Sequence, residues 1–275
     1  MTEIFYPVFI MGGLGLVFGA LLAFASVKFF VPVDERQTEI REILPGANCG
    51  ACGFPGCDGF AEALVEGVSE VSKCAVVSAA IIEEIASILG VSANAEEPKV
   101  AFLKCNGSTD KVVQNCTYEG VMDCRQAAVI PGNGPSSCSY GCLGLGTCEV
   151  VCPFDAIHIE NGLAVVDIEK CVGCGICVEQ CPREVLLLIP KSAKVQVDCN
   201  SPLKGPDVKK SCSVGCIGCT ICVKACPVQA IEMVESVAVI DPYKCTNCGI
   251  CATKCPVKCI SDRRPQELRE KIPVA

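Results

Sequence analysis

Cysteine is the residue type that dominates the chemistry available to this sequence. The chain has 275 residues, of which 26 are cysteine and only one, His158, is histidine. The cysteines stand in short runs such as CVGCGICVEQCP and CIGCTICVKACP, where thiols three residues apart converge on a common point. Such runs favour metal centres with thiolate ligands over disulfide bridges, which belong to oxidising compartments.

The spacing within these runs favours iron–sulfur clusters over zinc. A Cys-x-x-Cys-x-x-Cys run followed by a Cys-Pro pair is typical of [4Fe–4S] ligation. Zinc sites made of four cysteines exist, so a zinc-rich structural protein remains an alternative. His158 follows a strand-like stretch without a partner motif, which indicates a surface or edge residue. The formal net charge of −8 argues against nucleic-acid binding.

The first group of cysteines lies on the glycine-rich stretch NCGACGFPGC. Glycine lets the backbone of such a loop fold closely around a cluster. Apolar residues from Phe60 to Val68 follow at helical spacing, and AAIIEEIASILG predicts a second amphipathic helix. We therefore expect a [4Fe–4S] cluster with these ligands: Cys49, Cys52, Cys57 and Cys74.

An internal repeat organises the cysteines that follow. SCSYGCLGLGTCEVVCPFDAI at 137–157 matches SCSVGCIGCTICVKACPVQAI at 211–231 without a gap, and the same offset carries KCVGCGICVEQCP at 170–182 onto KCTNCGICATKCP at 244–256. Two such runs in one module are typical of two-cluster bacterial ferredoxins, in which the fourth cysteine of each run ligates the other cluster. The repeat therefore predicts two copies of one fold, with two clusters in each.

This arrangement assigns ligands to four more clusters. In the second module, one cluster has Cys216, Cys219, Cys222 and Cys255, and the other has Cys226, Cys245, Cys248 and Cys251. In the first module, one cluster has Cys152, Cys171, Cys174 and Cys177. The remaining cluster lacks its middle thiol because Leu145 stands where the repeat has Cys219. The nearest cysteine completes the set Cys138, Cys142, Cys148 and Cys181, with Cys124 as the alternative to Cys138.

Five clusters of four ligands use twenty of the 26 cysteines. The others are Cys105, Cys116, Cys124, Cys199, Cys212 and Cys259. Cys259 matches Val185 in the repeat, which indicates a small buried hydrophobic residue. Cys124 and Cys199 each follow an aspartate and precede Cys138 and Cys212 by nearly equal intervals. The segment KCNGSTDKVVQNCTYEGVMDC could therefore supply a sixth cluster.

An apolar segment near the N-terminus is expected to hold these modules at a membrane. From Tyr6 to Val27 the chain would span about 33 Å as a helix, enough for a hydrocarbon core of about 30 Å. The preceding MTEIFYP has none of the basic residues of a secretory signal. The first positive charges are Lys28, Arg36 and Arg41, so the positive-inside rule predicts a single-pass protein with its N-terminus outside and its cysteine-rich body in the cytoplasm.

Together these features predict an α+β protein of several small units. They are a transmembrane anchor (1–31), a helical [4Fe–4S] domain (32–91), a connecting segment of uncertain fold (99–136), two ferredoxin-like modules of βαβ type (137–190 and 195–262) and a tail (263–275).

The anchor, the CGACGFPGC unit, the CNG segment, GCLGLGTCEVVCPFDAI and the ferredoxin-like modules together resemble the family of the B subunit of the Rnf complex. This complex is the ion-translocating ferredoxin:NAD oxidoreductase of bacterial membranes, and the resemblance is to the long form with two ferredoxin-like modules. It implies a translocase subunit of the cell membrane that takes electrons from soluble reduced ferredoxin and passes them toward a flavin-containing subunit that reduces NAD.

The resemblance also implies that other membrane subunits couple this electron flow to Na⁺ or H⁺ export. We expect no catalytic residues, flavin or NAD in this chain, whose cofactors would be the [4Fe–4S] clusters alone. The alternative is a polyferredoxin subunit of a membrane hydrogenase or another reductase.

Overall fold

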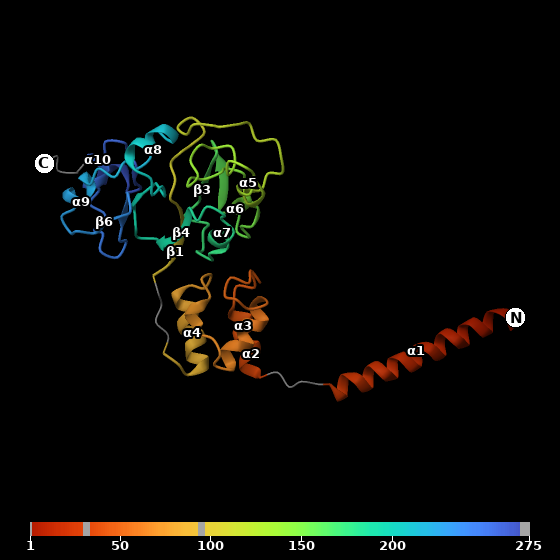
Figure 1. The fold of residues 1–275 in the computed structure, drawn as a ribbon. Coiled ribbons are helices and arrows are strands. Elements are labelled where there is room, and N and C mark those ends of the chain that lie inside the picture. Colours follow the sequence, from red (N-terminus) through yellow and green to blue (C-terminus); the bar gives the residue numbers. More distant parts are fainter. Residues whose placement is uncertain (1, 30–33, 93–96, 270–275) are drawn as a thin grey trace.

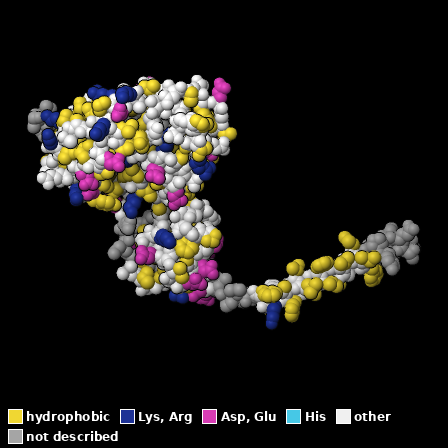
Figure 2. Space-filling model, in the orientation of Figure 1, with side chains coloured by type: hydrophobic (Ala, Val, Ile, Leu, Met, Phe, Trp, Pro, Cys, Tyr) yellow, Lys and Arg dark blue, Asp and Glu magenta, His cyan; other side chains and the backbone are white. Residues whose placement is uncertain are grey.

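The computed structural model describes residues 2–29, 34–92 and 97–269. Its first element is a long apolar helix that extends away from the rest of the chain (Figure 1). This helix, α1 (Thr2–Lys28), includes the part of the described chain that is long and apolar enough to cross a membrane, Phe9–Lys28, with a mean hydropathy of 2.1. From Phe9 to Val27 its large side chains, among them Leu22 and Phe24, are exposed (Figure 2). An apolar surface all round a helix suits a lipid environment, which supports the predicted anchor.

A compact helical unit follows, as predicted. It contains α2 (Glu35–Ile43), α3 (Gly56–Val65), a 3-10 turn η1 (Val71–Lys73) and α4 (Ala79–Leu89). The Asp34 carboxylate and the Ser78 hydroxyl accept hydrogen bonds from the first turns of α2 and α4, and Gly90 ends α4 in the left-handed conformation. The helices enclose a small apolar core: Ile40, Leu44, Phe60, Ala61, Leu64, Val71, Ile82 and Ile85.

Val68 does not extend the apolar face of α3, contrary to the expectation from its spacing. The helix ends at Val65, and the Val68 side chain lies beyond it, 70% exposed. Gly67, at a φ of 71°, turns the backbone away from the helix before this residue.

The rest of the described chain contains four two-stranded antiparallel sheets, arranged as two similar sets. In the first set β1 (Lys99–Leu103) pairs with β4 (Leu186–Pro190), and the hairpin β2 (Ile157–Glu160)–β3 (Leu163–Val166) lies between them in sequence. In the second set β5 (Val195–Val197) pairs with β8 (Ile260–Asp262) around the hairpin β6 (Ile231–Val234)–β7 (Val237–Ile240). The strand order thus follows the sequence repeat.

These ladders correct the predicted βαβ type, which implies parallel strands. The hairpins turn within two residues, such as Asn161 and Gly162 with φ of 48° and 74°, and a turn this tight can only join antiparallel strands. The strand β1 also comes from the segment whose fold was left uncertain, and its pairing with β4 closes the first set of strands.

Short helices carry the cysteine runs into these sheets. Four of them, α6 (Thr147–Val150), α7 (Ile176–Glu179), α9 (Ile221–Ala225) and α10 (Ile250–Lys254), have a cysteine at their second position. Each follows a residue in the left-handed conformation, which turns the chain sharply before that cysteine. The other helices of this part are α5 (Cys124–Ala128), α8 (Gly205–Ser211) and α11 (Gln266–Arg269).

Each set of strands has its own apolar core, and equivalent positions of the repeat are buried in the two cores. Val185 and Cys259 are equivalent in the repeat, and each is 1% exposed. The interpretation of Cys259 as a small buried residue is confirmed. His158 lies on β2 with 44% of its side chain exposed and its Nδ1 3.4 Å from Glu149, which confirms its surface position.

The two sets of strands are joined by hydrogen bonds between distant segments. The amide of Val113 donates to the Ser211 carbonyl at 2.9 Å, and the amide of Ser213 donates to the Lys111 carbonyl at 2.9 Å. The Arg263 guanidinium lies over the Phe102 ring, 4.4 Å from its centroid. The repeated modules therefore share an interface.

We expect Phe60→Ala to destabilise the helical unit by about 3–5 kcal/mol, because the ring is 1% exposed and packs against Phe54 beside the cysteine loop. Hydrogen exchange of the full chain, followed by mass spectrometry, should show faster exchange in α2 and α4. The control Val68→Ala trims an exposed side chain and should change local stability by less than about 0.5 kcal/mol. Unchanged protection in Phe60→Ala would show that this core does not hold the unit together.

Candidate metal-cluster sites

Cysteine thiols from separate segments meet in small cavities of the ferredoxin-like part. All 26 cysteines are free, and most are partly or fully buried. In the second module a cavity with about 360 Å³ of empty space, including the part open to solvent, is lined by four thiols of one predicted set: Cys216, Cys219, Cys222 and Cys255. Cys222 lies on α9, whereas Cys255 follows α10. The structure thus brings together thiols of two different runs, as the ferredoxin pattern requires.

The other predicted set of this module also meets: Cys226, Cys245, Cys248 and Cys251. Burial, together with the sulfurs of Cys245 and Cys248, raises the pKa of Cys251 to about 12. After burial, the Cys226 sulfur also raises the pKa of Cys245. The Cys226 sulfur accepts a hydrogen bond of 3.3 Å from the amide of Ala230. Thiols crowded in this way are held as thiolates most readily by a cationic centre between them.

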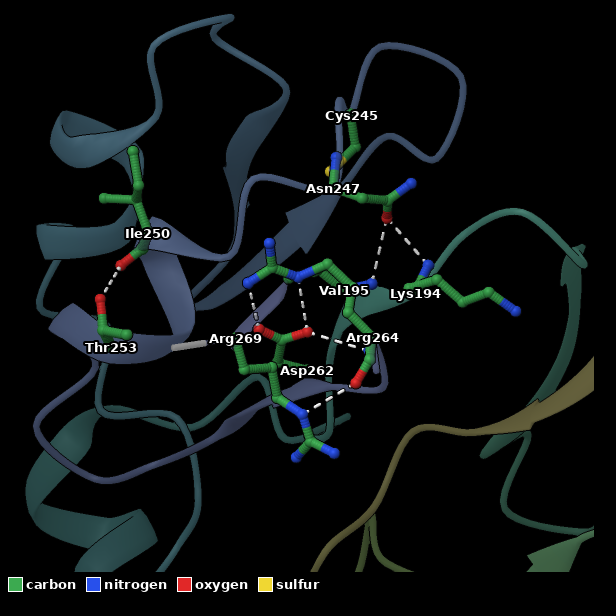
Figure 3. Close-up of polar contacts among 9 residues, drawn as sticks. All are labelled: Lys194, Val195, Cys245, Asn247, Ile250, Thr253, Asp262, Arg264 and Arg269. Atoms are coloured by element: carbon green, nitrogen blue, oxygen red, sulfur yellow. Dashed lines mark hydrogen bonds and ion pairs between the residues drawn. The ribbon is translucent and has the colours of Figure 1, made fainter. Parts of the chain in front are cut away.

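Polar side chains fix the loop that carries these thiols (Figure 3). The Asn247 amide oxygen accepts hydrogen bonds from the backbone of Lys194 and Val195, at 2.8 and 3.2 Å, which ties the loop to the start of β5. The Asn247 backbone amide points at the Cys245 sulfur, 3.4 Å away. The side chain of Asn247 therefore places a cluster ligand and one of its hydrogen-bond donors.

A buried ion pair covers the same loop. Arg264 donates two hydrogen bonds to Asp262, at 2.9 and 2.6 Å, and both side chains are 11% exposed. The bond to Asp262 raises the pKa of Arg264, and the sulfurs of Cys248 and Cys251 add to the effect. A side chain at position 249 would collide with this pair, because a Cβ on Gly249 would lie 2.7 Å from the Asp262 carboxylate. A positive charge thus lies close to thiolates of this site.

The first module repeats this second arrangement with the predicted set Cys152, Cys171, Cys174 and Cys177. Burial, and to a smaller extent the sulfurs of Cys174, Cys171 and Cys152, raise the pKa of Cys177 to about 12. The amide of Ala156 donates to the Cys152 sulfur at 3.4 Å, as Ala230 does to its equivalent in the second module.

One expected ligand set is rearranged. A cavity of about 330 Å³ is lined by Cys124, Cys142, Cys148 and Cys181. Cys138, the first choice from the sequence, does not line it, whereas the alternative Cys124 does. Leu145, at the position that lacks a cysteine, is buried and packs with Cys124.

The N-terminus of α5 explains how Cys124 reaches this cavity. Asp123 caps α5 by accepting a hydrogen bond of 2.8 Å from the amide of Arg125. The amide of Cys124 in turn donates to the Thr147 hydroxyl at 2.6 Å, next to Cys148. Sequence spacing alone could not show this approach, although the Asp-Cys pair is a recognisable capping signal.

The helical unit presents the remaining predicted set, Cys49, Cys52, Cys57 and Cys74, around its glycine-rich loop. The Asn48 side chain accepts a hydrogen bond of 2.8 Å from the amide of Cys57 and so closes the loop. Burial raises the pKa of Cys74, and the sulfurs of Cys52 and Cys49 raise it further. The loop faces the first ferredoxin module, because the Cys49 sulfur also raises the pKa of Cys174, after burial (Figure 1).

The spacing of these donors suits a cluster better than a single ion. Within residues 2–29, 34–92 and 97–269, no three His, Cys, Asp or Glu side chains gather closely enough to hold one metal ion. A zinc ion would draw its sulfurs to about 2.3 Å. Four thiols around a cavity, with backbone amides aimed at their sulfurs, instead fit a [4Fe–4S] cluster with Cys₄ ligation.

Comparisons with known proteins agree with this chemistry. Residues 44–76 match the family described as "Putative Fe-S cluster", residues 164–187 the "4Fe-4S binding domain", and residues 215–259 the "4Fe-4S dicluster domain". Iron–sulfur binding and ferredoxin-type domains are thus confirmed.

The chain is also similar to whole proteins of known complexes. It is 45% identical to the B subunit of the Na(+)-translocating ferredoxin:NAD(+) oxidoreductase complex of Acetobacterium woodii, over 95% of this chain and 78% of that protein. It is 42% identical to the B subunit of the proton-translocating ferredoxin:NAD(+) oxidoreductase complex of Clostridium ljungdahlii, over 89% and 87%. A match of 40% to the B subunit of the ion-translocating oxidoreductase complex of Methanosarcina acetivorans covers 86% and 89%.

We expect Cys124→Ala to remove one cluster, about four iron atoms per chain, because its thiol faces the cavity with Cys142, Cys148 and Cys181. Iron and acid-labile sulfide analysis of the anaerobically purified full chain measures this loss. Cys116→Ala is the matched control, since this thiol is exposed and should leave the iron content unchanged. Full iron content in Cys124→Ala would mean that another residue completes the set.

We expect Arg264→Gln to lower the reduction potential of the nearby cluster by on the order of tens of millivolts, because a positive charge stabilises the reduced state. Redox titration followed by electron paramagnetic resonance measures the shift. Arg36→Gln is the control, since Arg36 forms the same two-bond pair with Asp34 at an exposed site of the helical unit. An equal shift in both variants, or none in Arg264→Gln, would contradict a local effect.

Proposed function

Because the chain belongs to the family of the B subunit of ion-translocating ferredoxin:NAD(+) oxidoreductase complexes, we propose that it takes electrons from reduced ferredoxin and relays them within such a complex. The chain is an electron-transfer subunit of a translocase, and its own residues perform no bond-making on a substrate. Ferredoxin is its proposed donor, and other membrane and peripheral subunits are its proposed partners.

The observation that carries this function is the pairing of thiol groups within each ferredoxin module. The Cys177 sulfur lies close enough to raise the pKa of Cys148, and the Cys222 sulfur raises that of Cys251, in each case after burial and nearer sulfurs. These pairs join the two groups of one module. Adjacent one-electron centres held by a rigid backbone allow an electron to pass without movement of the protein.

We propose five clusters with a revised ligand set for one of them. The proposed groups are Cys49, Cys52, Cys57 and Cys74; Cys124, Cys142, Cys148 and Cys181; Cys152, Cys171, Cys174 and Cys177; Cys216, Cys219, Cys222 and Cys255; and Cys226, Cys245, Cys248 and Cys251. When bound, the clusters supply one-electron transfer at low potential. The chain's contribution is to supply thiolates, direct backbone amides at the sulfurs and bury the sites, which sets their potentials.

The Cys49 sulfur lies near enough to raise the pKa of Cys174, after burial, which supports a relay that extends from the helical unit into the first module. We propose that α1 anchors the chain in the cell membrane with its N-terminus outside, so that the cysteine-rich body lies in the cytoplasm where ferredoxin is available. Lys28, in the last turn of α1, supports this orientation. NAD and flavin would bind to other subunits, and other membrane subunits would move Na⁺ or H⁺.

We expect the anaerobically isolated complex that contains this chain to reduce NAD with electrons from reduced ferredoxin. Reduced ferredoxin should also bleach the visible absorption of the purified full chain, because its clusters accept the electrons. Hydrogen evolution without ferredoxin:NAD turnover would favour a polyferredoxin subunit of a hydrogenase and contradict the proposal. Several zinc ions per chain with negligible iron would exclude electron transfer altogether.

A further inference from the structure

A further group of thiols lies between the two ferredoxin modules, outside the five proposed sites. A cavity of about 430 Å³ is lined by Cys105, Cys138, Cys199 and Cys212. This volume, which includes space open to solvent, is close to the roughly 360 and 330 Å³ found in the same way at two proposed cluster sites. A cavity similar to those of the proposed cluster sites is thus present where the two ferredoxin modules meet. Its four thiols belong to none of the five proposed ligand sets.

The two copies of the repeat each contribute two of the four cysteines that line this cavity, from similar positions. Cys138 and Cys212 occupy equivalent positions in the matching segments SCSYGC and SCSVGC. Cys105 follows the strand β1, and Cys199 follows the equivalent strand β5. Each module therefore contributes one cysteine after its first strand and one from the start of its first cysteine run.

The hydrogen bonds to these sulfurs follow the same symmetry. The Cys105 sulfur accepts from the amide of Gly107, two residues on, and from the amide of Cys142, each at 3.4 Å. The Cys199 sulfur likewise accepts from Ser201, two residues on, and from Cys216. Because Cys142 and Cys216 are equivalent in the repeat, both modules direct the same two donors at the same sulfur.

Glycines leave room between the sulfurs. A Cβ at Gly141 would lie 3.4 Å from the sulfurs of both Cys105 and Cys138, and a Cβ at Gly107 would lie 3.5 and 3.6 Å from those of Cys212 and Cys105. The sulfurs of both modules thus turn toward the same small space, which side chains at these positions would narrow.

We propose that Cys105, Cys138, Cys199 and Cys212 hold a sixth [4Fe–4S] cluster, which connects the two ferredoxin modules. Neutral thiols would accept only weak hydrogen bonds from the backbone amides that point at these sulfurs, because a thiol sulfur is a weak acceptor. Thiolates in a buried space need a cationic partner, and four thiolates with directed amides match the ligation of the other sites. This inference rests on the proposed function and extends it.

The sixth site lies next to a proposed cluster of each module. Cys105 accepts a hydrogen bond from the backbone of Cys142, a proposed ligand in the first module, and Cys199 from that of Cys216, a proposed ligand in the second. The sixth cluster would therefore complete a continuous relay from the helical unit to the last cluster of the second module.

The Cys259 thiol lies within hydrogen-bonding distance of a ligand of each neighbouring site, Cys199 of the sixth site and Cys216 of the second module. Cys259 is buried between the two sites but belongs to neither ligand set. Six sites use 24 of the 26 cysteines, and the other two are Cys259 and the exposed Cys116.

The iron content of the anaerobically purified full chain tests the inference. We expect about 24 iron atoms and as many sulfides per chain, and a loss of about four of each in the double variant Cys138→Ala/Cys212→Ala. The variant should also lack the electron paramagnetic resonance signal of one cluster while the other signals remain. Cys116→Ala is the matched control and should retain all the iron.

A wild-type chain with about 20 iron atoms would overturn the sixth site and leave the proposed function intact. A double variant with the full wild-type iron content would do the same. If the double variant lost more than one cluster through misfolding, the wild-type count of about 24 or about 20 would still decide. A wild-type chain without iron would overturn the proposed function itself.

Discussion

The burial of many thiols close together, away from water, is the constraint on which this structure depends. Burial and neighbouring sulfurs raise the pKa values of Cys148, Cys177 and Cys251 to about 12, so the bare groups resist ionisation. Iron in a cluster removes this conflict by binding the thiolates directly. The short strands and helices enclose only small apolar cores, so we infer that cluster binding also contributes much of the folding free energy.

The backbone prepares each site before metal binding. Left-handed residues such as Gly146 and Gly175 turn the chain directly before the helices that carry a cysteine, and amides such as those of Ala156 and Ala230 point at sulfurs. These devices occur at equivalent positions in both modules. Repetition of a whole module thus duplicates the ligands, their hydrogen bonds and the interface through which the copies meet.

The sequence repeat predicted the two modules and the thiols that meet within them, because ligand spacing in a short run is fixed locally. It could not place Cys124 and Cys138, since both positions depend on how the long segment before the first run folds back. Hydrogen bonds among Asp123, Cys124 and Thr147 hold Cys124 at the first module. Cys138 instead lies at the junction, opposite Cys212, its equivalent in the repeat. The pairing of β1 with β4 and of β5 with β8 could not be predicted, because a pattern of cysteines carries no information about strands far apart in the sequence.

Mössbauer spectroscopy of the full chain, purified anaerobically with isotope-enriched iron, tests most directly whether thiol groups hold iron and sulfide as cubane clusters. We expect nearly all the iron to show the spectrum of tetrahedral sulfur-ligated sites in [4Fe–4S] clusters. A spectrum dominated by single iron ions or by two-iron clusters would contradict this view of the cavities.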